Sequence, residues 1–284
     1  MNDNLGSVES MNISVLKRGL SHYARQGRRL AKRRLLYLKE LALGGGDLRE
    51  SLLIKLLGQH YASTYRRQWE LSDEEPHFFS QRMGLFEFAF GENGHGPYPF
   101  SRGFFSSEVL QIGDRLLDIG CGDGFFTRRF FSERCAHIDA VDIEPSAIEA
   151  AMANNSGRNI TYHLLDAVNQ PFPQDRYDVV VWDGALGHFS AETTSHMLEK
   201  IRRHLTSGGI FVGSESLGIE GSDHLQFFHS LEDLNSLFKP YFRHVMLRSI
   251  NYRIGRGEGF IRQEAYWRCS NEPQRLQDCN WQVY

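Results

Sequence analysis

The most regular hydrophobic pattern lies in the second half of the chain, where short apolar runs alternate with helical stretches. This alternation is typical of a parallel sheet with crossover helices. Two further apolar runs flank a glycine-rich segment and predict an antiparallel pair at the end of the sheet. The predicted strands are residues 115–119, 138–142, 161–165, 177–182, 210–214, 242–251 and 260–269, and the predicted helices are 125–132, 146–154, 193–205 and 231–238.

The first hundred residues follow a different, helical period. Apolar residues recur at helical spacing over 13–43 until three glycines, and a second apolar stripe runs through 47–70. Residues 92–99 are rich in Gly and Pro and predict a loop, and 100–112 predict a short helix. We therefore expect a basic N-terminal arm (1–46), a helical cap or lid segment (47–107), an α/β domain (108–270) and a C-terminal tail (271–284).

Charge is distributed unevenly along the 284 residues. The net charge is −3, but residues 1–39 hold nine Lys and Arg against two acids, a balance of +7, which leaves −10 for the remainder. Such an arm suits an anionic membrane surface, a lipid-linked glycan or RNA. A solvated helix face explains the same run, so both interpretations stay open.

Several classes of protein fit the sequence poorly. The four cysteines show no CxxC pair, which favours free thiols in a reducing compartment. No apolar run approaches the ~18 residues of a membrane span, and the basic N-terminus lacks the order of a secretory signal. We expect a cytoplasmic protein, with peripheral membrane association as an alternative. The histidines form no HxH, HxxxH or HExxH arrangement, so we expect no metal.

The strongest motif is LLDIGCGDG at residues 116–124, an apolar strand that runs into a GxGxG turn. Glycines allow a sharp turn and let a ligand approach the backbone. The next strand ends at Asp142, whose carboxylate can accept both hydroxyls of a ribose, and the third strand ends at Asp166. A dinucleotide site prefers GxGxxG and binds a pyrophosphate. Here Asp118 and Asp123 lie beside the turn, which favours a cationic ligand.

These residues resemble motif I of the class I S-adenosylmethionine-dependent methyltransferases, whose cofactor carries a sulfonium and an ammonium but no phosphate. The resemblance extends over residues 115 to about 269. VDIEP at 141–145 looks like the family's ribose-binding strand end, LDA at 165–167 like the adenine segment, and YDVVVWD at 177–183 like motif IV. LTSGGI at 205–210 is similar to the L-x-P-G-G turn, with Ser207 in place of proline.

The resemblance implies a Rossmann-like, seven-stranded, mostly parallel sheet with an antiparallel terminal pair, preceded by a helical cap. It also implies S-adenosylmethionine as the cofactor. The cofactor-binding residues that it implies are Asp118, Gly120, Cys121, Gly122, Asp142, Ile143, Asp166, Ala167 and Asp183. Gly124 completes the turn.

Methyl transfer is an in-line displacement, which requires alignment of the acceptor and removal of a proton from a hydroxyl acceptor. His188, in the loop after the fourth predicted strand, is a candidate general base, although helix capping or packing explains it as well. Asp183 and Glu215 are candidates for a pair of acids facing the acceptor; solvated carboxylates at strand ends are the alternative.

The predicted activity is that of a methyltransferase of enzyme class 2.1.1 acting on oxygen or nitrogen of a small molecule. Segments such as HFF at 77–79, RGFF at 102–105 and HLQFF at 224–228 look like a bacterial subgroup that methylates small molecules or cell-surface glycans, so we expect a sugar or glycan intermediate as acceptor. The DNA-type N/D-P-P-Y/F signature is absent, which argues against a flipped DNA base. Two alternatives remain: an RNA methyltransferase that uses the basic arm, and a non-catalytic cofactor-binding module.

Overall fold

The computed structural model describes residues 32, 49–57, 98–218, 224–254, 260–276 and 282–283. The chain divides into two compact units, residues 1–57 and 58–284. In the first unit, residues 49–57 are helical, as predicted. The leucines of this helix are 38 to 53% exposed: Leu52, Leu53, Leu56 and Leu57. Most of the predicted arm and cap lies outside the described residues.

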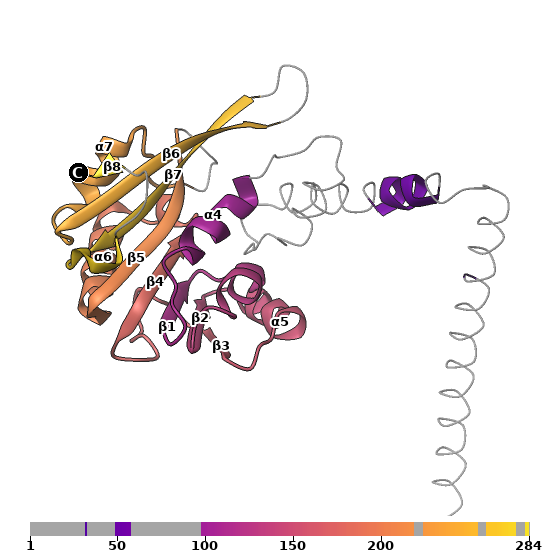
Figure 1. Ribbon diagram of the computed structural model, residues 1–284, viewed down its shortest axis with the longest axis horizontal. Coiled ribbons are helices and arrows are strands. Elements are labelled where there is room, and N and C mark those ends of the chain that lie inside the picture. The colour runs from indigo at the N-terminus through magenta and orange to yellow at the C-terminus, as the bar shows by residue number, and fades with distance from the viewer. Residues whose placement is uncertain are drawn as a thin grey trace, which may run out of the picture. The chain divides into compact units, whose positions relative to one another are not determined.

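The second unit is built on one sheet with the strand order β3-β2-β1-β4-β5-β7-β6-β8 (Figure 1). β1 to β5 pair in parallel, and β7, β6 and β8 continue the sheet in antiparallel pairs. The strands are β1 (Arg115–Ile119), β2 (His137–Asp142), β3 (Ile160–Leu164), β4 (Tyr177–Asp183), β5 (Leu205–Leu217), β6 (His244–Ile254), β7 (Phe260–Ser270) and β8 (Gln282–Val283). The predicted seven strands are confirmed, and the two-residue β8 adds a short edge.

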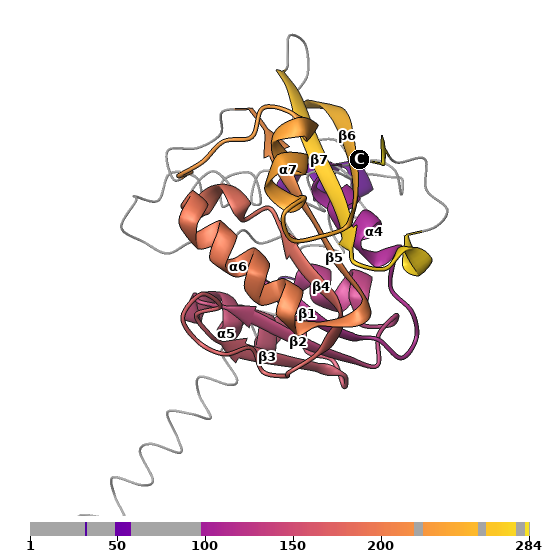
Figure 2. The ribbon, with the colours of Figure 1, turned by 90° about the vertical axis from the view of Figure 1, so that its left-hand side faces the viewer.

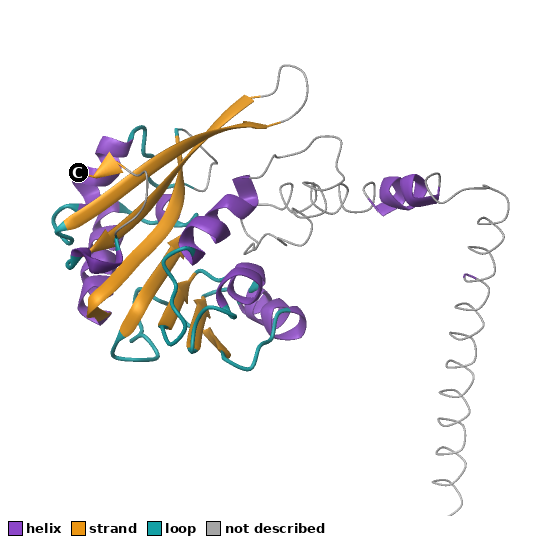
Figure 3. Cartoon of the chain, viewed as in Figure 1, coloured by secondary structure: helices purple, strands orange, loops and turns teal. Residues whose placement is uncertain are grey.

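Helices cover both faces of this sheet (Figure 2, Figure 3). One face carries α4 (Tyr98–Ser107), the π-helix η1 (Thr127–Phe131) and α5 (Pro145–Asn154); the other carries α6 (Ala191–His204) and α7 (Leu231–Phe238). Two short 3-10 helices, η2 (Leu186–His188) and η3 (Pro273–Arg275), complete the described elements. This three-layer arrangement is the α/β fold that the alternating pattern predicts.

The apolar pattern explains how the layers pack. Residues at alternate strand positions enter different cores, because successive side chains point to opposite faces. Leu117, Val180 and Phe211 belong to the core under α6 and α7, whereas Leu116 and Val179 belong to the core under η1 and α5. On α6 the buried residues recur at helical spacing: Thr194, Met197, Leu198 and Ile201.

Two local predictions need correction. β5 begins at Leu205, so the predicted turn at Gly208 and Gly209 lies inside the strand, where the pairing with β4 shifts register. Glycine within a strand commonly marks such an irregularity. The predicted helix at 125–132 is a π-helix over Thr127–Phe131, in which the Ser132 N–H donates to the Thr127 carbonyl five residues back.

Candidate functional site

The glycine turn lies at the carboxyl ends of β1 and β2. Gly120, Gly122 and Gly124 have φ angles of +71°, +54° and +69°, which other residues adopt only with strain. At Gly122 nothing lies within 4 Å of the position that a Cβ would take, whereas at Gly124 it would stand 2.4 Å from the Tyr162 hydroxyl oxygen. Gly124 is therefore required by packing, and Gly122 leaves the backbone open to a ligand.

Asp142 is joined directly to this turn. One of its carboxylate oxygens accepts a hydrogen bond from the Gly122 N–H at 2.8 Å, and the other accepts from the Glu144 N–H at 3.0 Å. Burial raises the pKa of Asp142 above its usual value. The next residue, Ile143, leaves 67% of its surface exposed. The structure thus places a carboxylate and an exposed apolar side chain side by side at the end of β2.

Asp166 and Ala167 begin the turn after β3, the neighbour of β2. The carboxylate of Asp166 accepts from the Val168 N–H at 2.9 Å and from the Asn169 side-chain amide at 2.7 Å. Hydrogen bonding to Asn169 lowers the pKa of Asp166, so this group is a fixed anion near neutrality. Since β3 lies beside β2, these residues and Ile143 border one region of the sheet edge.

Two acids lie deeper in the site, Asp118 buried and Asp183 partly buried. Asp118 is 4% exposed and accepts from the Thr127 hydroxyl; burial raises its pKa to about 7. Asp183, at the end of β4, accepts from the Ser106 hydroxyl at 3.2 Å, and burial raises its pKa to about 6. The positive charge of Arg102 opposes this effect of burial, because it acts to lower the pKa of both acids. A cationic ligand would favour the ionised form of each acid.

Cys121 lies in the glycine turn but has no nucleophilic character. Its side chain is buried, and burial raises the pKa of the thiol well above its usual value. A neutral thiol is a weak nucleophile. We therefore treat the Cys121 side chain as a packing residue of the turn.

His188 and Glu215 meet at the short helix η2. Glu215 is 4% exposed, and its two oxygens accept from the N–H groups of Gly187 and Ser216, each at 3.0 Å. It is therefore not a solvated carboxylate; it supports the turn that carries His188. The His188 ring is exposed and meets the His224 ring edge-on at 4.6 Å between centroids. Glu215 bonds to η2 and Asp183 bonds to α4, and after burial the charge of Glu215 also raises the pKa of Asp183.

Sequence reasoning assigned no role to several residues that the fold brings to this region. Arg102 and Ser106 of α4 act on Asp183, as described above. Glu264 of β7 is 3% exposed, pairs with the Arg262 Nε at 2.9 Å, and has its pKa raised by burial to about 7. The available signal was an Arg and a Glu two residues apart, which places both side chains on one face of a predicted strand.

In the described ranges, no group of three or more His, Cys, Asp or Glu is arranged to hold a metal ion. Among the helices of these same residues, none is long and apolar enough to cross a membrane.

Comparisons with known proteins agree with this geometry. Residues 116–209 match the family model described as a methyltransferase domain. The chain is 26% identical to phosphoethanolamine N-methyltransferase of Plasmodium falciparum, over 48% of this chain and 52% of that protein. It is also 26% identical to carboxy-S-adenosyl-L-methionine synthase of Aeromonas salmonicida, over 60% of this chain and 76% of that protein. The solved structure of the YcgJ protein of Bacillus subtilis shares the fold, with a TM-score of 0.50 and 16% identity over 60% of this chain and 97% of that chain.

The segment at 116–209 therefore belongs to the class I S-adenosylmethionine-dependent methyltransferases, a family that uses S-adenosylmethionine as cofactor. The chain spans about half or less of the first curated relatives it matches: 52%, 41% and 16% of their lengths. The residues present fit the cofactor, because an open glycine backbone, a ribose-type acid, an exposed apolar side chain and two deeper acids converge at one edge.

Proposed function

We propose that this protein is an S-adenosylmethionine-dependent methyltransferase that acts on oxygen or nitrogen of a small molecule, a sugar or cell-surface-glycan intermediate. The observation that supports it best is the link between the glycine turn and Asp142, with the buried Asp118 and the partly buried Asp183 beside it. S-adenosylmethionine, when bound, supplies an electrophilic methyl group on a sulfonium. The steps left to the chain are binding, orientation and proton removal.

Each binding residue has a defined task in this proposal. Asp142 holds the ribose hydroxyls through lone pairs not used by Gly122 and Glu144. Ile143 covers one face of the adenine, and the turn at Asp166 and Ala167 meets its edge. Asp118 and Asp183 complement positive charge on the methionine portion, since carboxylates favour a cation in a poorly hydrated site.

His188 is the proposed proton acceptor. Its imidazole is exposed in η2, beyond the end of β4, and histidine is the side chain that most often serves as a general base. Glu215 acts as a positioning residue, because it holds the Gly187 N–H next to His188. An acceptor that approaches over η2 would meet both the base and the carboxyl edge of the sheet.

The acceptor class rests on the resemblance of segments at 77–79, 102–105 and 224–228 to glycan-type enzymes. The relatives act on varied substrates by name, including phosphoethanolamine and malonyl-acyl-carrier protein.

The basic arm supports a second candidate, RNA methylation, because nine Lys and Arg side chains fall within 39 residues. Deleting residues 1–46 separates the two. Loss of steeply salt-dependent RNA binding together with loss of methylation favours RNA, whereas unchanged methylation of a small acceptor favours the first proposal.

The direct test is transfer of labelled methyl from S-adenosylmethionine to pooled sugars, sugar nucleotides and RNA, with wild type and His188→Ala. We expect label in the sugar fraction and a loss of about 10²-fold or more in rate for His188→Ala, with unchanged cofactor affinity. Cofactor binding without transfer to any acceptor would instead support the non-catalytic module.

A further inference from the structure

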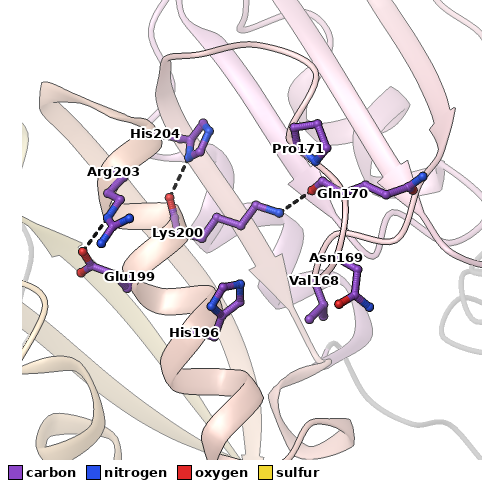
Figure 4. Close-up of a pocket in the computed structure, with 9 residues that line it drawn as sticks. All are labelled: Val168, Asn169, Gln170, Pro171, His196, Glu199, Lys200, Arg203 and His204. Atoms are coloured by element: carbon purple, nitrogen blue, oxygen red, sulfur yellow. Dashed lines mark hydrogen bonds and ion pairs between the residues drawn. The ribbon is translucent and has the colours of Figure 1, made fainter.

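Lys200 is a partly buried residue of α6 and extends toward the turn after β3 (Figure 4). Its Nζ donates to the Ala167 carbonyl at 2.6 Å and to the Gln170 carbonyl at 2.5 Å. These carbonyls lie at the two sides of one short turn. A single ammonium group therefore connects a core helix to the segment that follows β3.

The turn itself is closed by internal hydrogen bonds. The Gln170 N–H donates to the Asp166 carbonyl at 2.9 Å, and the Asp166 N–H donates to the Gln170 side-chain oxygen at 2.9 Å. With the Asp166 carboxylate bonded to Val168 and Asn169, the turn behaves as one unit. The position of this turn relative to the sheet then depends on its contacts with neighbouring elements.

An open pocket lies beside the turn. It has a volume of about 360 Å³ and lies between the turn and α6, lined by Val168, Asn169, Gln170, Pro171, His196, Glu199, Lys200, Arg203 and His204. Ala167 and Val168 pack partly against the core, and across the pocket the Lys200 side chain bridges from α6 to Gln170, as Figure 4 shows. Its Nζ also stands 4.3 Å from the centroid of the Phe172 ring, a favourable cation–π distance.

The helix that carries Lys200 is well fixed. Met197, Leu198 and Ile201 are fully buried in the core under the sheet. Hydrogen bonds from a charged donor are roughly twice as strong as neutral ones. A charged donor on a rigid helix can therefore fix the pocket side of the turn.

We propose that Lys200 is a positioning residue for the cofactor: it holds the turn at 166–170 in the place where Asp166 and Ala167 meet the adenine. This inference rests on the proposed function. Lys200 touches neither cofactor nor acceptor in this account, and its effect passes through the turn.

Arg176 provides a matched control. Its Nη1 donates to the carbonyls of Arg203 at 2.7 Å and Leu205 at 2.9 Å, so it also joins α6 to a neighbouring segment through two main-chain carbonyls. Those carbonyls lie at the amino end of β5, away from the carboxyl edge. Loss of Arg176 should weaken the fold without weakening the cofactor site.

The experiment compares wild type, Lys200→Met and Arg176→Met by calorimetric titration with S-adenosylhomocysteine and 5′-methylthioadenosine, alongside thermal melting. Methionine keeps the apolar stem and removes the donor. We expect Lys200→Met to raise both dissociation constants about tenfold, with a raised KM for S-adenosylmethionine and an unchanged kcat at saturation. Arg176→Met should change both dissociation constants less than twofold.

Equal affinity in Lys200→Met and wild type would overturn the inference, as would the same loss of affinity in Arg176→Met. If Lys200→Met does not fold, Lys200→Arg and Lys200→Gln replace it: arginine should retain most of the affinity, and affinity in the glutamine variant equal to that of wild type would contradict the role. A wild type that binds neither compound would contradict the proposed function first and leave no adenine site for Lys200 to position.

Discussion

The parallel and antiparallel halves of the sheet use charged residues in different ways. In the parallel half, Asp142 and Asp166 are bonded to main-chain N–H groups within their own or neighbouring turns. In the antiparallel half, buried charges pair with side chains: Glu264 with Arg262, and Arg268 with Glu108 of the segment after α4. The first arrangement leaves carboxylates in turns at a strand edge, and in the second the pair of Arg268 with Glu108 joins β7 to the segment after α4.

The largest expected effect is on the parallel half. Gly124→Ala combines a left-handed φ of +69° with a Cβ placed 2.4 Å from the Tyr162 hydroxyl oxygen. We expect unfolding free energy to fall by about 3 kcal/mol and binding of S-adenosylhomocysteine to be lost. Denaturant unfolding and calorimetry check this. Gly208→Ala is the control, because nothing lies within 4 Å of its Cβ position; equal losses in both variants would contradict the assignment.

The next prediction concerns the antiparallel half. Arg268 is 5% exposed, donates to the Phe105 carbonyl at 3.1 Å and pairs with Glu108. Arg268→Met should lower the unfolding free energy by about 2 kcal/mol, since it removes hydrogen bonds to a charged donor. Affinity for S-adenosylhomocysteine should change less than threefold. A tenfold loss of affinity in a fully folded Arg268→Met protein would show that the antiparallel half also contributes to cofactor binding.

A smaller effect is expected from pH. With folded pKa values of about 7 for Asp118 and about 6 for Asp183, both acids gain charge as the pH rises from 5.5 to 7.5. S-adenosylmethionine carries a positive charge on sulfur, and S-adenosylhomocysteine does not. The ratio of the affinity for the first to the affinity for the second should therefore rise about fivefold over this pH range. Asp118→Asn should remove most of the difference, and a ratio independent of pH in the wild type would be the opposite result.

The raised pKa of Asp118 also makes the stability of the folded protein depend on pH. The unfolded carboxyl of Asp118 ionises near 3.8, below the folded value of about 7. The folded state therefore binds more protons between these values, and the ligand-free protein should lose stability as the pH rises through this window.

The smallest expected effect is at Ile143. Its side chain is 67% exposed, so Ile143→Ala should leave the melting temperature unchanged. Loss of apolar contact with the adenine should weaken S-adenosylhomocysteine binding about threefold. Isothermal titration of both proteins measures this directly; unchanged affinity would place the adenine elsewhere along the edge.

The comparison also explains which features were predictable from sequence. Gly120, Asp118 and Asp142 were found because a glycine turn and strand-end acids are local signals at fixed spacing. The pairing of Arg268 with Glu108 joins residues 160 positions apart, and no local pattern reports such contacts. The hydrogen bond from the Gly187 N–H to Glu215 was not predicted, because it joins residues 28 positions apart. The shift of register at Gly208 and Gly209 depends on how β5 pairs with β4, and hydrophobic periodicity does not report strand pairing.

Calorimetric titration of the wild type and Asp142→Ala with S-adenosylmethionine, S-adenosylhomocysteine and NAD tests the central claim most directly. The account predicts saturable binding of both sulfur compounds by the wild type, loss of that binding in a folded Asp142→Ala protein, and no binding of NAD. A folded wild type that binds neither sulfur compound, or that binds NAD at this site, would contradict it.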